Sequence, residues 1–391
     1  MSNTSKQEYL QTIRHRYKYA STKKQKSHLL DELCQVCKYN RKYAITLLNA
    51  TDERKNRHKN KRGRKPIYDH PHILEVLIFI WRKTELLCAT RLKESIPLWV
   101  PFFELFIIEE DIKIKLMNIS ASTIDRLLAK HRPKFTKRGL ATTKPGSILK
   151  KHIPVKTNQW DETIPGFVEA DTVAHCGTTT EGSYVFSINC VDIATGWTIQ
   201  RATWGKGQQG TLEAIKDIEQ TLPFPIKGFD CDNGSEFLNW HLHSYLTERK
   251  KPIAFTRARA YHKNDNAHIE NKNWTHIRQM LGYQRFDDPG LTDLLNQLYS
   301  SEWNDYFNFF IPSVKLISKT RVGSKIKKVY DKPKTPFQRL MVSEHIDNQT
   351  KERLQQYLRK LNPVELHQKM ASKIKHILKI VNDSKLINNS E

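Results

Sequence analysis

The sequence predicts a multidomain protein with an α-helical N-terminal region, a central mixed α/β domain and a small basic C-terminal region. At 391 residues the chain is too long for one compact core. Apolar residues recur at helical spacing in the first third, whereas three strand-like runs followed by alternating helix and strand patterns occupy the centre. The charge also differs between these segments, so they are chemically distinct.

The charge pattern indicates a polyanionic partner. The net charge is +24: residues 1–150 hold 32 Lys+Arg and 14 Asp+Glu (+18), residues 151–310 hold 15 and 20 (−5), and residues 311–391 hold 18 and 7 (+11). Basic flanks suit phosphate contacts, and an acidic centre suits hard metal ions. A basic surface with no nucleic-acid partner is the alternative.

Composition also bears on location. Six cysteines form no regular framework, which favours a reducing compartment. The N-terminus lacks an apolar signal region, and the longest apolar stretch has nine residues that include Glu75. We therefore expect a soluble, intracellular protein with no membrane association.

Residues 1–50 are predicted to form a helix-turn-helix DNA-binding unit. The apolar positions follow helical spacing, and the segment KYNRK suits a tight turn between two helices. Cys34 and Cys37, with His15 and His28 upstream, raise the alternative of a zinc site. A buried helical cysteine is favoured, because no second C-x-x-C exists and Cys37 lies on the apolar face.

Residues 51–70 read as a basic linker. Their RGRKP segment is an extended arm of the kind that enters a narrow minor groove, which makes Arg62, Arg64 and Lys65 candidate DNA contacts. A plain solvated linker is the alternative.

A second helical, helix-turn-helix-like DNA-binding unit is predicted over residues 71–135. Its last helix has Ser120 or Ser122 as the N-cap, and Arg126 and Lys130 would face DNA if this is a recognition helix. Residues 136–156 have little periodicity and read as a linker.

Residues 157–310 are predicted to form a mixed five-stranded sheet flanked by helices. Helices are expected at 209–222 and 235–250 and after residue 266, and strands at 166–173, 183–193, 197–204, 226–234 and 253–259. The basic region 311–391 begins with short strands and turns and continues as helices.

Three carboxylates in the central domain are the candidate catalytic and metal-binding residues. Asp171 ends the first strand run at VEAD, Asp232 ends a later strand before an Asn-Gly turn, and Glu270 begins a helix. Burying three such charges without cations would cost several kcal/mol each. Mg²⁺ suits the site because it takes few protein ligands and leaves positions for phosphate oxygens.

Other acids have competing interpretations. Asp230 shares a strand face with Asp232 and is the rival metal ligand. Glu169 shares a strand face with Asp171 and is a candidate supporting acid. Asp192 is expected to start a turn. Asp161 and Glu236 are expected to be surface or helix-start acids.

The asparagine-rich stretch from Arg259 to Asn273 surrounds Glu270. Asn266, Glu270 and Asn273 follow helical spacing and share one face. Asparagine and lysine side chains can bind phosphates or base edges. The predicted DNA contacts here are Arg259, Lys263, Asn264, Asn266, Lys272 and Asn273.

The triad, with 60 and then 37 intervening residues, resembles the D-D-E motif of bacterial insertion-sequence transposases and retroviral integrases. The segments DNGSEF and NDNAHIENKN are similar to their counterparts in that family, and this likeness covers about residues 155–310. The preceding helix-turn-helix region and the trailing TPFQRLM segment also resemble those of insertion-sequence transposases. The resemblance implies a ribonuclease-H-like catalytic domain, two Mg²⁺ (or Mn²⁺) ions, DNA cleavage and 3′-hydroxyl strand transfer, and a homo-oligomer on terminal-repeat and target DNA. It also implies a cytoplasmic, nucleoid-associated location in a bacterial or archaeal host. The retroviral His-His-Cys-Cys zinc domain is not matched.

We therefore expect a DNA transposase that binds the terminal repeats of its element. One alternative is a ribonuclease-H-type nuclease that cleaves without joining. The other is a non-catalytic DNA-binding regulator derived from a transposase.

Overall fold

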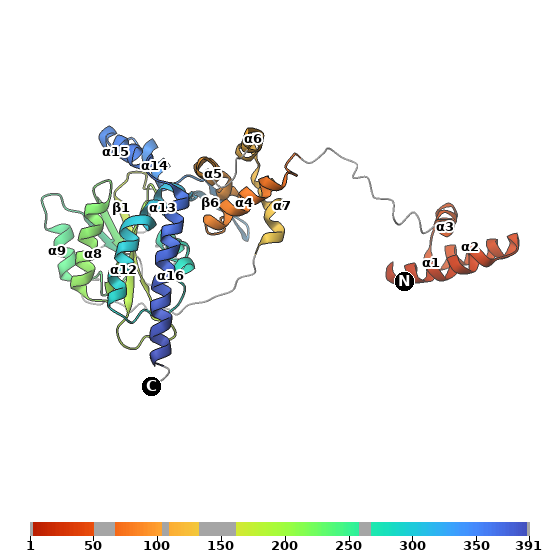
Figure 1. The fold of residues 1–391 in the computed structure, drawn as a ribbon, viewed down its shortest axis with the longest axis horizontal. Coiled ribbons are helices and arrows are strands. Elements are labelled where there is room, and N and C mark those ends of the chain that lie inside the picture. The colour runs from red at the N-terminus through yellow and green to blue at the C-terminus, as the bar shows by residue number, and fades with distance from the viewer. Residues whose placement is uncertain (1–2, 51–66, 104–108, 133–161, 258–266, 389–391) are drawn as a thin grey trace. The chain divides into compact units, whose positions relative to one another are not determined.

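The structure is a computed structural model that describes residues 3–50, 67–103, 109–132, 162–257 and 267–388. At positions 3, 267, 268, 270 and 384–388 it describes the backbone alone. The chain divides into two compact units, Met1–Ile67 and Tyr68–Glu391 (Figure 1).

The first unit is a small three-helix cluster. Its helices are α1 (Asn3–Tyr19), α2 (Lys23–Cys37) and α3 (Arg41–Leu48). Thr22 begins α2 with a capping box, and Asn40 caps α3 by accepting from the Lys42 N–H. The predicted turn between two helices is therefore present at 38–40, although its role in DNA binding stays a prediction. Cys37 is buried in the core of this unit beside Leu33.

The second unit begins with a helical region. Its elements are α4 (Pro71–Lys83), α5 (Ala89–Trp99), η2 (Val100–Phe102), α6 (Glu110–Asn118), α7 (Ala121–Leu128) and η3 (Ala129–His131). The Ser120 side chain accepts from the Thr123 N–H, which confirms Ser120 as the N-cap of α7. Apolar side chains from α4, α5 and α7 join the same core as the sheet at the centre of this unit.

A mixed five-stranded sheet lies at the centre of the second unit, as predicted. Its strands are β1 (Phe167–Ala174), β2 (Val185–Asp192), β3 (Thr198–Trp204), β4 (Gly228–Cys231) and β5 (Ala254–Arg257). The order is β3-β2-β1-β4-β5. β1 pairs antiparallel with β2 and parallel with β4, and β4 pairs parallel with β5. The parallel pairing of β1 with β4 ends at Ala170 and Cys231, one residue before Asp171 and Asp232. β1 itself continues to Ala174, paired with β2, so Asp171 lies inside the strand and not at its end as predicted.

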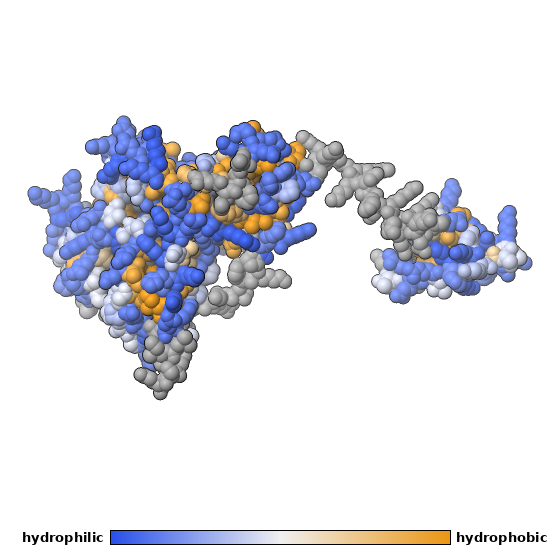
Figure 2. Space-filling model, in the orientation of Figure 1, coloured by the Kyte–Doolittle hydropathy of each residue, from blue (hydrophilic) through white to orange (hydrophobic). Residues whose placement is uncertain are grey.

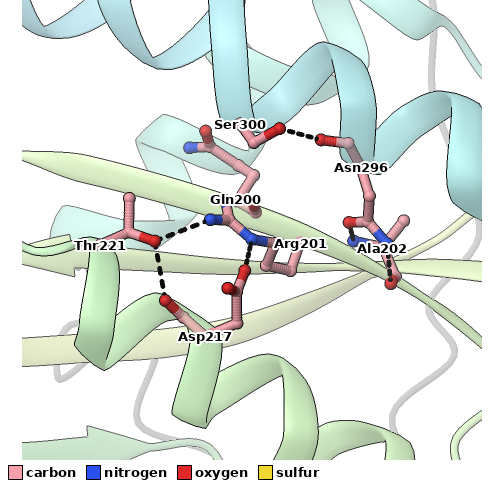
Figure 3. Close-up of polar contacts among 7 residues, drawn as sticks. All are labelled: Gln200, Arg201, Ala202, Asp217, Thr221, Asn296 and Ser300. Atoms are coloured by element: carbon pink, nitrogen blue, oxygen red, sulfur yellow. Dashed lines mark hydrogen bonds and ion pairs between the residues drawn. The ribbon is translucent and has the colours of Figure 1, made fainter.

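Helices cover both faces of this sheet. They are α8 (Gln208–Thr221), α9 (Trp240–Thr247), α10 (Ala267–Lys272), η5 (Asn273–Arg278), α11 (Gln279–Leu281), α12 (Gly290–Leu298), η6 (Tyr299–Trp303) and α13 (Asn304–Phe310). Arg201 of β3 pairs with Asp217 of α8 on one face (Figure 3). Its neighbour Gln200 points to the opposite face, which α10 and η5 cover.

The helix predicted at 235–250 begins later than expected. Residues Ser235–Leu238 form turns, and α9 starts at Trp240 with Asn239 as its cap. The Asn239 amide donates to the carbonyl of Glu236 at 2.8 Å and accepts from the Leu242 N–H. A strong capping residue therefore set the start of the helix.

Two asparagine side chains close the outer edge of β3. Asn296 of α12 accepts from the Ala202 N–H at 2.7 Å and donates to the Ala202 carbonyl at 3.0 Å (Figure 3). Asn308 of α13 makes the same two bonds with Thr198, both at 2.8 Å. Unpaired backbone groups at a sheet edge invite pairing with another chain, so these amides protect the edge.

The C-terminal region begins with a two-stranded hairpin, β6 (Leu316–Val322) and β7 (Lys325–Tyr330). Three helices follow: α14 (Pro336–Val342), α15 (Asn348–Leu358) and α16 (Pro363–Asn388). α16 lies along α12, η6 and α13 (Figure 1). Much of the visible surface of the second unit is hydrophilic (Figure 2). Among the described residues, the helices lack the combined length and apolarity that crossing a membrane requires.

Candidate active site

Asp171 and Asp232 lie side by side on neighbouring parallel strands. In the register of β1 and β4, Glu169 is opposite Asp230 and Ala170 is opposite Cys231. The next step along each chain brings Asp171 beside Asp232, which directly follows β4. Because side chains alternate along a strand, both carboxylates point to the same face.

The two carboxylates oppose one another electrostatically. Burial and the neighbouring Asp232 raise the pKa of Asp171 well above its usual range. Burial and the charge of Glu236 likewise raise the pKa of Asp232 to about 6. Both side chains are half-buried, so each keeps a path to solvent. A cation between them would relieve the cost of both charges.

Asn273 connects Asp171 to a row of amides across the sheet. Its Nδ2 donates to Asp171 Oδ2 at 2.7 Å, and its Oδ1 accepts from Asn189 Nδ2 at 2.8 Å. Gln200 Nε2 in turn donates to Asn189 Oδ1 at 2.8 Å. Gln200, Asn189 and Asp171 occupy one row of the strand register. This row orients one oxygen of Asp171 and leaves its other oxygen accepting the Thr172 N–H at 2.8 Å.

Glu270 lies on α10, three residues before Asn273. That Glu270 shares a helix face with Asn273, as its spacing in the sequence indicates, stays a prediction. Glu169 helps to hold α10 in place, because its Oε2 accepts the Ile269 N–H at 3.1 Å. Glu169 is thus a supporting acid that acts through the helix. The Glu270 side chain lies outside the described atoms, so its distance to the two aspartates stays a prediction.

The interpretation of Glu236 as a surface or helix-start acid is wrong. Glu236 is 1% exposed, and its Oε1 accepts from Thr172 Oγ1 at 2.9 Å and from Lys206 Nζ at 2.8 Å. The turn after β4 folds this side chain back over Gly234, where an added Cβ would lie 2.6 Å from the Glu236 carboxyl carbon. Glycine at 234 therefore permits the turn, and Glu236 becomes a third acid beside the aspartate pair.

Two of the remaining acids have structural partners. Asp230 is buried and accepts from Thr256 Oγ1 of β5. Asp192 holds the turn between β2 and β3, as expected: its carboxylate accepts the Gly166 N–H, the Thr195 N–H and the Thr195 hydroxyl at 2.8, 2.8 and 2.6 Å. Asp161 lies outside the described residues.

Most of the predicted DNA contacts outside Asn273 cannot be placed in the site. Arg126 and Lys130 are exposed on α7 and η3. Lys272 is half-buried, and its Nζ lies 3.2 Å from His276 Nε2. Burial and the nearby Arg91 and Arg339 charges lower the pKa of Lys272 to about 7. The others lie outside the described residues: Arg62, Arg64, Lys65, Arg259, Lys263, Asn264 and Asn266.

The donor set fits a divalent cation only in part. Among the described side chains, no group of three or more His, Cys, Asp or Glu residues is arranged to hold a metal ion. Asp171 and Asp232 nevertheless supply two adjacent, partly open carboxylates, and oxygen ligands of this kind suit Mg²⁺. The side chain of Glu270, the third ligand proposed from the sequence, lies outside the described atoms.

Sequence reasoning missed Asn189, Gln200, Thr172 and Lys206. Asn189 lies in a fully buried, mostly apolar strand, and Gln200 is buried in the next strand. A polar side chain inside an apolar run was the available signal, because buried amides need partners. Lys206 carried no such signal, since it follows β3 in a polar turn.

The fold and site define a mixed α/β protein with two neighbouring carboxylates just beyond the point where the parallel pairing of β1 and β4 ends. No protein-family model matches the sequence. An uncharacterized protein of Sinorhizobium fredii, y4rM, is 34% identical over 345 residues, which are 87% of this chain and 96% of that protein. The chain therefore belongs to the same family as y4rM.

Two solved structures are weakly similar. An intasome of simian T-cell lymphotropic virus, bound to the PP2A regulatory subunit B56 gamma, has 12% identity and a TM-score of 0.31, covering 57% of this chain and 68% of that chain. The catalytic core domain of BIV integrase has 15% identity and a TM-score of 0.29, covering 46% and 96%. Likeness of this strength carries no argument about activity.

Proposed function

We propose that this chain is a DNA transposase that binds the terminal repeats of its element, cleaves DNA strands and transfers the new 3′-hydroxyl to target DNA. The observation that carries the proposal is the Asp171–Asp232 pair on adjacent parallel strands, with Asn273 of the Glu270-bearing helix bonded to Asp171. The spacing of the triad and the basic segments on both sides of the acidic domain support it.

In this proposal Asp171, Asp232 and Glu270 hold two Mg²⁺ (or Mn²⁺) ions. When bound, such ions activate the attacking oxygen and stabilise the leaving oxygen of an in-line phosphodiester displacement. The protein's own side chains orient the metal ligands. Asn273 fixes one oxygen of Asp171, and Glu169 holds the N-terminal turn of α10.

Each step is a balanced exchange at phosphorus. In cleavage, a water oxygen forms a P–O bond, the bond to the 3′-oxygen breaks, and that oxygen takes up a proton. In joining, the freed 3′-hydroxyl loses its proton and attacks a target phosphodiester, and the target strand's own 3′-oxygen leaves and takes up a proton. One site that aligns an oxygen with a phosphate can support both steps.

The test uses full-length protein, Mg²⁺ or Mn²⁺, and duplexes that carry the DNA flanking the gene. We expect joined products with the wild type, and none with Asp171→Asn, Asp232→Asn or Glu270→Gln, while all variants keep DNA binding. Glu213→Gln, an exposed acid on α8, is the matched control. Full joining activity in Asp171→Asn would overturn the proposal.

The same assay separates the alternatives. A ribonuclease-H-type nuclease would yield cut strands with no joined product. A non-catalytic regulator would bind DNA without either reaction, and titration calorimetry would detect no Mg²⁺ or Mn²⁺ binding.

A further inference from the structure

The β6–β7 hairpin stands out from the rest of the second unit because both of its faces are exposed. Every residue of β7 and all of β6 except Leu316 is exposed. Three of its residues are among the most exposed large hydrophobic residues that the structure describes, Ile317 at 65%, Val322 at 67% and Ile326 at 55%. A two-stranded ribbon alone in water is marginally stable, so an uncovered ribbon of this kind indicates a missing partner.

The charge of the hairpin identifies the chemistry of that partner. Between Leu316 and Tyr330 the sequence holds five basic residues and no acidic ones. Lys319 is directly opposite Lys328 in the strand register, and like charges in that position are destabilising. Within the described part of the chain, none of the five forms an ion pair with a carboxylate. They are Lys319, Arg321, Lys325, Lys327 and Lys328.

The base of the hairpin is firmly attached to the sheet domain. Arg339 of α14 pairs with Asp331 and donates to the Ser313 carbonyl at 2.7 Å. The Lys315 N–H donates to Asp331 Oδ1 at 2.6 Å, and Lys315 Nζ donates to the Ala194 carbonyl of the β2–β3 turn at 2.8 Å. A fixed base and an exposed tip are the properties of an arm that presents its side chains to a large ligand.

We propose that the β6–β7 hairpin is a ribbon that binds duplex DNA, with the face that carries Lys319, Arg321 and Lys328 against the phosphates. These three side chains share one face, because directly opposed and alternate residues of an antiparallel pair point the same way. The major groove of B-form DNA admits a two-stranded ribbon, whereas that of duplex RNA is too narrow and deep. DNA is therefore the favoured polyanion. The groove dimensions favour DNA over duplex RNA, and the inference rests on the proposed function only in taking a nucleic acid as the polyanion.

The test is binding of the full-length chain to a short fluorescent duplex of arbitrary sequence, in EDTA, over a series of salt concentrations. The variant is Lys319→Glu/Arg321→Glu/Lys328→Glu. Each lost phosphate contact lowers the slope of log affinity against log salt by about 0.9, so we expect a fall of about 3 together with weaker binding. The control, Lys250→Glu/Lys251→Glu/Lys360→Glu, makes the same charge change at exposed positions away from the hairpin and should change the slope by less than about 1.

Equal slopes for the hairpin and control variants would overturn the inference, as would a larger loss for duplex RNA of the same sequence. If the charge reversal lowers the melting temperature, the neutral variant Lys319→Gln/Arg321→Gln/Lys328→Gln replaces it, with an expected fall of the same size. Because EDTA removes the divalent metal ions that the proposed reaction requires, this assay measures DNA binding without catalysis. A wild type that joins strands while the hairpin variant binds like the control would refute this inference alone, whereas a wild type that binds no duplex would refute the proposed function as well.

Discussion

Asn273 Nδ2 donates a hydrogen bond to Asp171 Oδ2 at 2.7 Å, across 102 positions of sequence. This bond ties the helix that carries Glu270 to the strand that carries Asp171. Asn189 holds the other end of the Asn273 amide, so the amide cannot turn without losing a partner. The bond thus sets both the direction of Asp171 and the position of the helix.

Asn273→Ala is expected to lower metal-dependent strand joining by about 10- to 100-fold, the usual cost of losing a group that orients a metal ligand. Raising the Mg²⁺ concentration should restore part of the rate, because the carboxylate itself remains. The measurement is the joining rate over a Mg²⁺ series, with melting curves to check folding. Asn271→Ala, an exposed asparagine on the same helix, is the control; equal rates for the two variants would contradict the role of Asn273.

Lys206→Met is expected to destabilise the protein by about 3 kcal/mol, because it leaves the buried Glu236 carboxylate without its cation. This value is at the low end of the cost of breaking a buried ion pair, because the Lys206 side chain is 21% exposed. Adding Glu236→Gln should recover part of the loss, because the uncompensated charge is then gone. Urea unfolding of the two single variants and the double variant measures the coupling. A cost no greater than that of Lys250→Met would refute this account.

Asn308→Ala is expected to cost about 3 kcal/mol and Asn296→Ala about 1 kcal/mol, because each leaves backbone groups of β3 unpaired. The larger cost is expected for Asn308→Ala because this site is fully buried, so water cannot replace the lost hydrogen bonds. Hydrogen exchange at the Thr198 and Ala202 amides, together with urea unfolding, measures both effects. Unchanged exchange at Ala202 in Asn296→Ala, relative to an exposed Gln297→Ala control, would show that the edge needs no amide.

Acid should destabilise the fold through His175. This ring is fully buried, stacks on Phe286 and lies 2.8 Å from Ser187 Oγ, and burial lowers its pKa to about 3. In the unfolded chain the His175 imidazole binds a proton near pH 6.5, whereas in the folded chain it stays neutral until about pH 3. Stability is therefore lost as the pH falls through this window, at about 1.4 kcal/mol per unit below 6.5.

The test of His175 compares urea unfolding at pH 7 and pH 5 for the wild type and His175→Gln. We expect the wild type to lose about 2 kcal/mol more than the variant between these conditions. His376→Gln, at an exposed histidine on α16, is the control and should behave like the wild type. Parallel losses in wild type and His175→Gln would assign the acid sensitivity to other groups.

The alternation of apolar residues and the turn signals were sufficient to predict the five strands, because both are local properties of the chain. The same local signals located Asp171 in the first strand and Asp232 at the end of a later one, and Ser120 as a helix cap. The helix start after β4 was wrong because Asn239, rather than the first polar residue, caps α9.

Only the tertiary structure decided which groups meet. Strand register aligned Gln200, Asn189 and Asp171 in one row, and the packing of η5 brought Asn273 onto that row. Folding of the DNGSEF turn buried Glu236 against Lys206, 30 residues away in the chain. A sequence pattern records which face a side chain occupies, but these contacts join distant segments. Their formation depends on register and helix docking, which no local pattern specifies.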